Sequence, residues 1–212
     1  MAKAACFVKA IDNARPYKSH RYDVFGPKVR RMLTLFGSYQ IDTWLLLESN
    51  PLVLSYCERP VVIHDAKPKL TVDFSVSYAE RDELWLIDRD TGANFSLEKS
   101  FPIFLEWARQ NNFDVRTMSK KDPSISKIYL ENWGYIVRDL SANSRYLNSH
   151  LLNSVLEVLE EPRPIIAVCN LFPLEDPVLV RVAVYSLLHS GKASCPDIKD
   201  SPLGPTSVVG LL

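Results

Sequence analysis

The sequence predicts an α/β protein in two parts, a mixed sheet flanked by helices and then a small, mostly helical domain. Between residues 53 and 88, short apolar runs with the character of β-strands follow one another, whereas apolar residues from 125 onwards recur at helical spacing. The chain has 212 residues and is 47% hydrophobic. This length allows one large domain, or a medium domain and a small one.

The first elements are one helix and a series of strands. Residues 38–48 place Ile41, Trp44 and Leu45 near one helical face, and Pro51 follows this predicted amphipathic helix. Strands are predicted at 53–57, 60–64, 70–78 and 84–88. In the third strand apolar residues alternate with polar ones, so one face is apolar and the other carries Asp73. Glu80-Arg-Asp predicts a hairpin turn before the fourth strand.

Helical spacing returns over 97–112, a strand is predicted at 113–118, and a second helical period runs over 125–140. Ser141-Ala-Asn-Ser is the best boundary in the chain. The predicted organisation is therefore an N-terminal arm at 1–35, a first domain at 36–142 and a second domain at 143–212.

The second domain begins with a predicted helix over 147–159, which Pro162 and Pro164 follow. A further helix has Asp176 as its N-cap and Pro177 at its first position, and it ends at Gly191. A Pro- and Gly-punctuated tail follows. These elements suggest a small helical or winged-helix domain.

The segment before residue 36 is strongly basic. It carries eight Lys and Arg against Asp12 and Asp23, with Tyr17, Tyr22 and Phe25 among them. Interleaved cations and aromatic rings are typical of a segment that lies along DNA, while a solvated tail is the simpler alternative.

Composition excludes several classes. No apolar run reaches the roughly 18 residues of a membrane span, and the N-terminus lacks the apolar stretch of a secretory signal, so we expect a cytoplasmic protein. The four cysteines are far apart and form no CxxC pair, which indicates reduced thiols. The four histidines have no metal-ligand spacing, and no Gly-rich phosphate loop is present.

Two carboxylates stand out. Asp73 lies on one predicted strand and Asp88 at the end of the next, and hairpin pairing would bring the two strands together. Two carboxylates at a sheet edge can hold Mg²⁺, which orients water and stabilises charge on a phosphodiester. Nucleases of the PD-(D/E)xK type arrange their site in this way, but an Asp at a strand end is more often a turn or cap residue.

Several segments together resemble the TnsA family. They are Phe36-Gly-Ser-Tyr-Gln, Leu46-Leu-Glu-Ser-Asn-Pro, Tyr56-Cys-Glu-Arg-Pro-Val-Val-Ile, Val72-Asp-Phe, Leu84-Trp-Leu-Ile-Asp and Leu130-Glu-Asn-Trp. That family supplies the endonuclease subunits of heteromeric transposases, which nick the 5′ strands at transposon ends. The resemblance implies a restriction-endonuclease-like domain followed by a winged-helix domain. It also implies three partners, namely transposon-end DNA, a DDE transposase and an AAA+ regulator.

Carried over residue by residue, Asp73 matches the central metal-binding Asp and Asp88 falls at the (E/Q)xK element. The family's early Glu falls at Tyr39 or Gln40, and its Lys is replaced by Asp90. Loss of one acid weakens metal binding, and loss of the lysine removes a charge that supports the attacking water.

Two functions follow from the resemblance. The first is a degenerate nuclease that binds DNA or the transposase. The second is an active Mg²⁺-dependent nickase using Asp73, Asp88 and Asp90, with Gln40 orienting water. A scaffold that contacts only proteins is the alternative from another class. The candidate DNA contacts are all basic: Lys28, Arg30, Arg31, Lys120, Lys121 and Lys127.

Overall fold

The chain folds into two compact units. The computed structural model describes residues 7–12, 14–67, 69–88, 94–119 and 126–212. The first unit contains Met1–Leu47 and Leu52–Asp122, and the second contains Glu48–Pro51 and Pro123–Leu212. Within the described ranges, no helix is long and apolar enough to cross a membrane.

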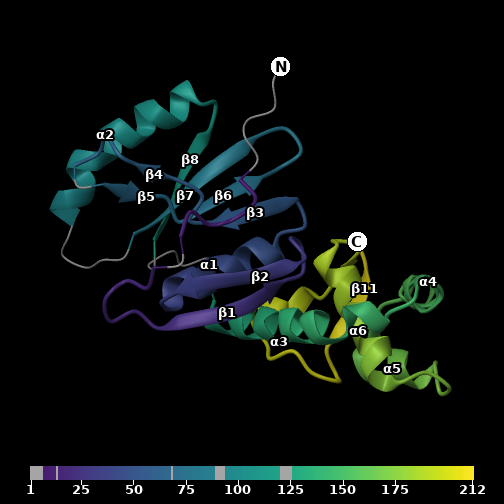
Figure 1. Ribbon diagram of the computed structural model, residues 1–212. Helices are drawn as coiled ribbons and strands as arrows, with labels where there is room; N and C mark the ends of the chain where they lie inside the picture. The colour runs from purple at the N-terminus through teal and green to yellow at the C-terminus, as the bar shows by residue number, and fades with distance from the viewer. Residues whose placement is uncertain (1–6, 13, 68, 89–93, 120–125) are drawn as a thin grey trace. The chain divides into compact units, whose positions relative to one another are not determined.

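The first unit is built on a four-stranded mixed sheet (Figure 1). Its strands lie in the order β3 (Ser55–Glu58), β6 (Phe74–Ser77), β7 (Asp82–Asp88) and β8 (Asp114–Ser119). The first two pairings are antiparallel and the β7–β8 pairing is parallel. A parallel pair needs a crossover, which helix α2 (Asn94–Gln110) supplies.

Helices cover both faces of this sheet. Phe104 and Ala108 of α2 pack with Leu84 and Leu86 of β7 in one buried cluster. On the opposite face, Trp44 of α1 (Ser38–Ser49) donates a 2.7 Å hydrogen bond from Nε1 to the hydroxyl of Tyr56 on β3. Adjacent strand residues point to opposite faces, so the alternation of Leu84, Trp85 and Leu86 separates the two packing layers. The α/β class with a mixed sheet is confirmed.

The predicted strand over 70–78 is interrupted. Leu70–Thr71 (β5) pairs with Val62–Ile63 (β4), whereas β6 pairs with β3 and β7. The chain changes partner between them, since the Val72 N–H bonds to the Val61 carbonyl and the Asp73 N–H to the Trp85 carbonyl. Asp73 therefore lies in a bend and not within a regular strand. The predicted turn at residues 80–82 is present, with the Tyr78 N–H bonded to the Arg81 carbonyl.

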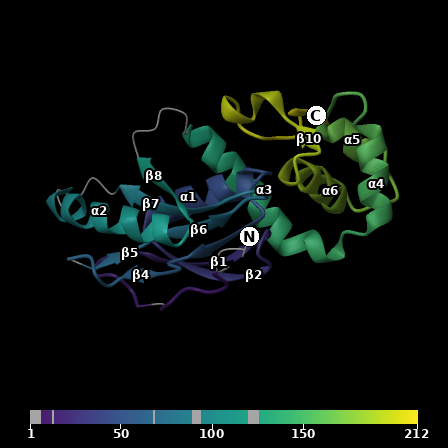
Figure 2. The same ribbon diagram turned by 90° about the horizontal axis from the view of Figure 1, so that it is seen from above.

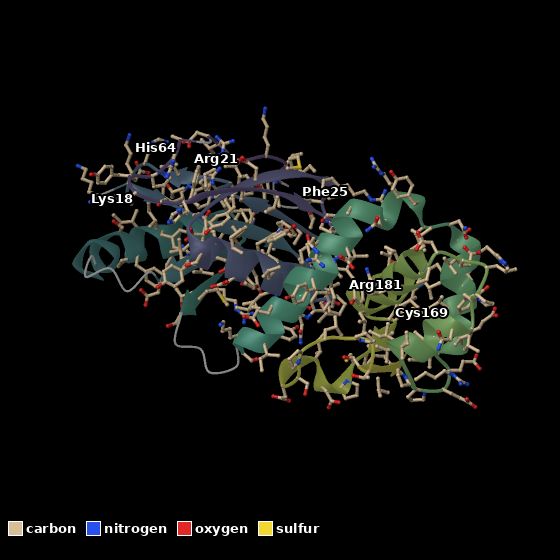
Figure 3. The ribbon with its side chains drawn as sticks, turned by 90° about the horizontal axis from the view of Figure 1, so that it is seen from below. Lys18, Arg21, Phe25, His64, Cys169 and Arg181 are labelled. Atoms are coloured by element: carbon tan, nitrogen blue, oxygen red, sulfur yellow. The ribbon has the colours of Figure 1, made fainter. Side chains whose placement is uncertain are left out.

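Residues 21–36 form a hairpin, so the expectation of a basic arm over 1–35 is wrong for this stretch. Strands β1 (Arg21–Gly26) and β2 (Arg31–Phe36) pair antiparallel along their whole length. Figure 3 labels Arg21 and Phe25 on β1. Leu33 and Leu35 are buried, and this apolar alternation fixes β2 in the core of the unit although its neighbours are charged.

The second unit combines helices with a small sheet (Figure 2). Its main helices are α3 (Lys127–Asn143), α4 (Ser149–Val158), α5 (Ile165–Asn170) and α6 (Pro177–His189), with the 3₁₀ turns η1 (Ser144–Tyr146) and η2 (Pro196–Lys199). Strands β9 (Arg163–Pro164), β10 (Ala193–Ser194) and β11 (Val208–Leu211) form an antiparallel sheet in the order β10-β11-β9. As predicted, the Asp176 side chain caps α6 by accepting from the Val178 N–H.

The boundary predicted after residue 142 is wrong, because α3 belongs to the second unit. This helix packs against α6 and η2. Its buried Asn132 donates from Nδ2 to the carbonyls of Ile198 and Ser201, both at 2.8 Å, and accepts from the Leu203 N–H. A helical period shows which face of a helix is apolar but not which element covers that face. Here the covering elements, α6 and η2, follow α3 in the sequence and belong to the second unit.

Residues Glu48–Pro51 also belong to the second unit. The fully buried Glu48 places Oε2 2.6 Å from Nε2 of His189, at the end of α6. Gly191 follows with a φ of +70°, and its Cα faces the Pro51 ring so closely that a Cβ would lie 2.6 Å from Pro51 Cβ. The sequence assigned His189 no role, and here it pairs with a buried acid.

The hairpin is tied to the sheet by an ion pair that can be tested. Arg31 donates from Nη1 and Nη2 to the two Glu58 oxygens at 3.0 and 2.6 Å, and the Glu58 side chain is only 4% exposed. We expect Arg31→Gln to lower the free energy of unfolding by about 1–3 kcal/mol, because Glu58 loses its charged partner. Arg21→Gln is the matched control in the same hairpin, since Arg21 and Asp23 are both about half exposed. Urea titration of both variants checks this, and equal effects would contradict it.

Candidate functional site

A cavity of about 430 Å³ in the first unit contains Asp73 and Gln40. Helix α1 supplies Gln40, and the bend before β6 supplies Asp73. The remaining walls come from the strands around the bend and from the segment before β1. The lining residues are Ile11, Asp12, Ala14, Pro16, Ser19, Phe36, Gln40, Arg59, Val62, Thr71 and Asp73.

Asp73 is held by hydrogen bonds through both carboxylate oxygens. The side chain is buried, with 3% of its surface exposed. Oδ1 accepts from Nε2 of Gln40 at 3.0 Å, and Oδ2 accepts from the backbone N–H of Ile87 at 2.8 Å. The carboxylate thus joins α1 to β7 across the bend, which explains why the strand breaks at this residue.

Gln40 has its amide orientation fixed by a second contact. Its Oε1 accepts from the Phe36 N–H at 2.8 Å, so its NH₂ group faces Asp73. Of the two positions at which the family's early Glu was expected, Gln40 is therefore the one that reaches Asp73. The neutral Gln amide can donate a hydrogen bond to the carboxylate, whereas a Glu at this position would place two anions together.

Arg59 closes the cavity from the side of β3. It has a φ of +41°, and its backbone N–H bonds to the Asp73 carbonyl at 2.8 Å. The guanidinium donates to the carbonyls of Asp12 and Thr34 and lies 4.7 Å from the Phe36 ring centroid. Burial lowers the pKa of Arg59 from its ordinary value, although nearby acids act in the opposite direction.

The segment before β1 lies over this cavity because Arg59 holds it twice. The Ile11 N–H bonds to the Arg59 carbonyl at 3.0 Å, while the guanidinium bonds to the Asp12 carbonyl. Glu58 and Arg59 are adjacent in the sequence, but Glu58 pairs with Arg31 while Arg59 binds backbone carbonyls, which no side-chain pattern reveals.

Two further acids, Asp88 and Asp90, were predicted at this site. Asp88 ends β7, is partly exposed and does not line the cavity. Asp90 lies outside the described residues. Within the described ranges, no three His, Cys, Asp or Glu side chains gather where they could hold a metal ion.

The residues around Asp73 do not fit a divalent cation in their observed arrangement. Mg²⁺ binds through oxygen, but the group that faces Asp73 Oδ1 is an N–H donor, and Oδ2 already accepts from the backbone. Turning the Gln40 amide would lose its bond from the Phe36 N–H. Each carboxylate oxygen thus already accepts a hydrogen bond, and the Gln40 amide presents an N–H group and not an oxygen to Asp73.

The basic residues that were predicted to contact DNA, as far as the structure describes them, differ in their exposure and in their partners. Lys28 donates from Nζ to the Val53 carbonyl at 3.0 Å, Arg31 is bound to Glu58, and Arg30 is exposed at the hairpin turn with a φ of +52°. Lys127 begins α3 in the second unit, is 90% exposed and lies 3.4 Å from Glu131. Lys120 and Lys121 lie outside the described residues.

Restoring an acid at position 40 tests this description of the site. We expect Gln40→Glu to lower the free energy of unfolding by about 1–3 kcal/mol at neutral pH, because Asp73 loses a donor and gains a like charge. Carboxylates in contact have at least one raised pKa, so the deficit should shrink as the pH falls and one of them binds a proton. We also expect Mg²⁺ or Mn²⁺ to raise the melting temperature of Gln40→Glu but not of the wild type.

The matched control is Gln110→Glu. Gln110 also donates an amide hydrogen bond to a carboxylate, Glu106, but on the exposed surface of α2. Its change should leave the melting temperature nearly unaltered with or without metal. A wild type that Mg²⁺ stabilises as much as Gln40→Glu would contradict the description of Asp73 as satisfied by hydrogen bonds.

Comparison with known proteins adds no assignment to this geometry. Neither a scan against protein-family models nor a search of curated proteins finds a match to the chain.

Proposed function

We propose that this protein is a TnsA-like subunit of a DNA-transposition complex whose nuclease site is degenerate. One observation carries the proposal: the Gln40 amide donates to Asp73 at the position where the family resemblance requires a second metal-binding acid. The order of elements supports it further. A helix, antiparallel strands, a crossover helix and a parallel strand give a mixed sheet flanked by helices, as the resemblance to restriction endonucleases implies.

The second unit supports the winged-helix part of this resemblance. Three helices alternate with short strands in the order α4, β9, α5, α6, β10, β11, and the last two strands pair as a hairpin. In such domains the third helix commonly reads DNA. Here α6 is largely apolar and buried, and its one arginine, Arg181, pairs with Asp139. We therefore assign α6 to packing and not to base recognition.

Charge favours the first unit as the surface that contacts DNA. It carries 18 Lys and Arg against 15 Asp and Glu, whereas the second carries 7 against 10. A polyanion such as DNA is attracted to the first unit and repelled by the second unit. Of Lys28, Arg30 and Arg31, the exposed Arg30 at the hairpin turn is the best-placed contact, since Lys28 and Arg31 bond to other parts of the unit.

A function limited to protein contacts is the second candidate. The observation that favours it is the engagement of Lys28 and Arg31 in intramolecular bonds, which removes two of the expected DNA contacts. Salt dependence separates the two functions, because phosphate neutralisation releases counterions and affinity then falls steeply with salt.

The DNA prediction is tested with the terminal DNA of the element that encodes this chain. We expect binding that weakens as salt rises and weakens further in Arg30→Glu, measured by fluorescence anisotropy. Arg145→Glu, at an exposed position in the acidic second unit, serves as the control and should bind as the wild type does. Binding that is absent at low salt, or equal in both variants, would favour the protein-only function.

The activity prediction is tested separately, with the partner transposase and Mg²⁺ present. We expect no 5′-strand cleavage by the wild type, and the same transposition frequency for Asp73→Asn, which keeps the size of the side chain. Cleavage by the wild type that is lost in both Asp73→Asn and Asp88→Asn, with DNA binding retained, would instead establish the Mg²⁺-dependent nickase. A cooperative thermal transition above the assay temperature shows that the variants are folded.

A further inference from the structure

The second unit contains a cavity of about 530 Å³ that no function discussed so far uses. Volumes of about 300–1,000 Å³ are typical of sites for small molecules. The walls come from α3, α5, α6 and the segment 202–205, so the cavity is bounded on several sides. Figure 3 labels Cys169 of α5 and Arg181 of α6, which contribute to it from neighbouring helices.

Most of the wall is apolar, and part of this apolar surface is exposed. Ile166 is 47% exposed and Tyr135 is 49% exposed, and both line the cavity together with Ile165, Leu203 and three prolines. When a ligand covers apolar side chains that are exposed to solvent in a concavity, their removal from water favours binding. Burial raises the pKa of the Cys169 thiol, which therefore stays protonated at neutral pH and adds to the apolar wall.

The polar groups of the cavity carry a net positive charge. The carboxylate of Asp139, 11% exposed, accepts hydrogen bonds from both arginines at 3.0–3.3 Å. Arg138 donates from Nε and Nη2 to Oδ1, and Arg181 donates from Nε and Nη2 to Oδ2. Two guanidinium groups thus share one carboxylate. Both turn the same edge toward Asp139, and no bond from either Nη1 is found among the described residues. Each arginine retains donors suited to a second anion.

Hydrogen bonds between the backbone of the wall and its neighbours hold the cavity in shape. The Ile166 N–H bonds to the Pro205 carbonyl at 2.8 Å, the Leu203 N–H to Asn132 Oδ1 at 2.7 Å and the Gly204 N–H to Ser207 Oγ at 2.9 Å. These contacts fix the wall at 202–205 without any ligand. A preformed site does not lose ordering entropy when it binds.

From this geometry we propose that the cavity binds a small molecule with an apolar chain and a single carboxylate. The apolar chain covers Ile166 and Tyr135, and the carboxylate accepts from the free edges of Arg138 and Arg181. A cationic ligand is disfavoured by the two arginines, and a neutral ligand of the same length lacks the charged hydrogen bonds. The proposal is independent of the transposition function, since it uses no residue of the first unit.

The test uses the full chain and octanoate below its micellar concentration as the probe, with octan-1-ol and octylammonium as ligands of equal chain length. We expect octanoate to bind at least about tenfold more tightly than octan-1-ol, since one charged hydrogen bond is worth that factor or more. Octylammonium should not bind. Calorimetry gives the affinities, and mass spectrometry follows alkylation of Cys169 by iodoacetamide, which octanoate should slow.

Two pairs of variants locate the site. Ile166→Asp should abolish octanoate binding, whereas Leu174→Asp, at a residue 99% exposed and outside the cavity, should not change it. Arg138→Gln should weaken octanoate by about tenfold and leave octan-1-ol unchanged. Its control is Arg145→Gln, because Arg145 stacks on Tyr146 as Arg138 does on Tyr135 but does not line the cavity.

If Ile166→Asp fails to fold, the comparison of Arg138→Gln with Arg145→Gln still decides the question. The Arg138 side chain is 67% exposed, so its substitution should not prevent folding. Equal affinity for octanoate and octylammonium would overturn the proposal. An unchanged alkylation rate of Cys169 at saturating octanoate would also overturn it, as would octanoate binding that Arg138→Gln leaves intact.

Discussion

The carboxylate of Asp73 is the interaction on which the first unit depends. It accepts from Gln40 of α1 and from the backbone N–H of Ile87 in β7, so one buried group fixes a helix to a strand on either side of a bend. A buried carboxylate must be fully hydrogen-bonded, because desolvation of the charge otherwise outweighs the gain from folding. The break between β5 and β6 lies at this group, and Arg59 holds the segment at Ile11 and Asp12 over the cavity that contains it.

The two units solve the same electrostatic problem differently. In the first unit, the carboxylate of Asp73 is stabilised by two neutral N–H donors, whereas in the second unit Asp139 is shared by two arginines with donors remaining. Neutral donors stabilise a carboxylate but leave its negative charge in place. A site with excess guanidinium attracts anions. The two sites therefore differ in the charge that they present to a ligand.

The sequence predicted local structure well and long-range partners poorly. Periodicity gave α1, the hairpin turn at 80–82 and the capped helix α6, since these depend on neighbouring residues. It missed the β1–β2 hairpin, because the Lys and Arg residues of this stretch led to its interpretation as a basic arm. It also placed α3 in the wrong unit, and it did not foresee Arg59, whose partners are backbone carbonyls. For the candidate site, residue identity singled out Asp73 and Gln40, but only the structure shows that the two are bonded to each other.

The bond between Gln40 and Asp73 also has a consequence for how such a site changes over generations. Codons for Gln and Glu differ by a single base, so a second acid at position 40 is within reach of one mutation. That mutation would replace a hydrogen bond with a repulsion in the folded chain, and it would be tolerated only where metal is at hand to relieve it. Of these two residues one base apart, Gln is therefore the one that gives Asp73 a hydrogen bond without a metal.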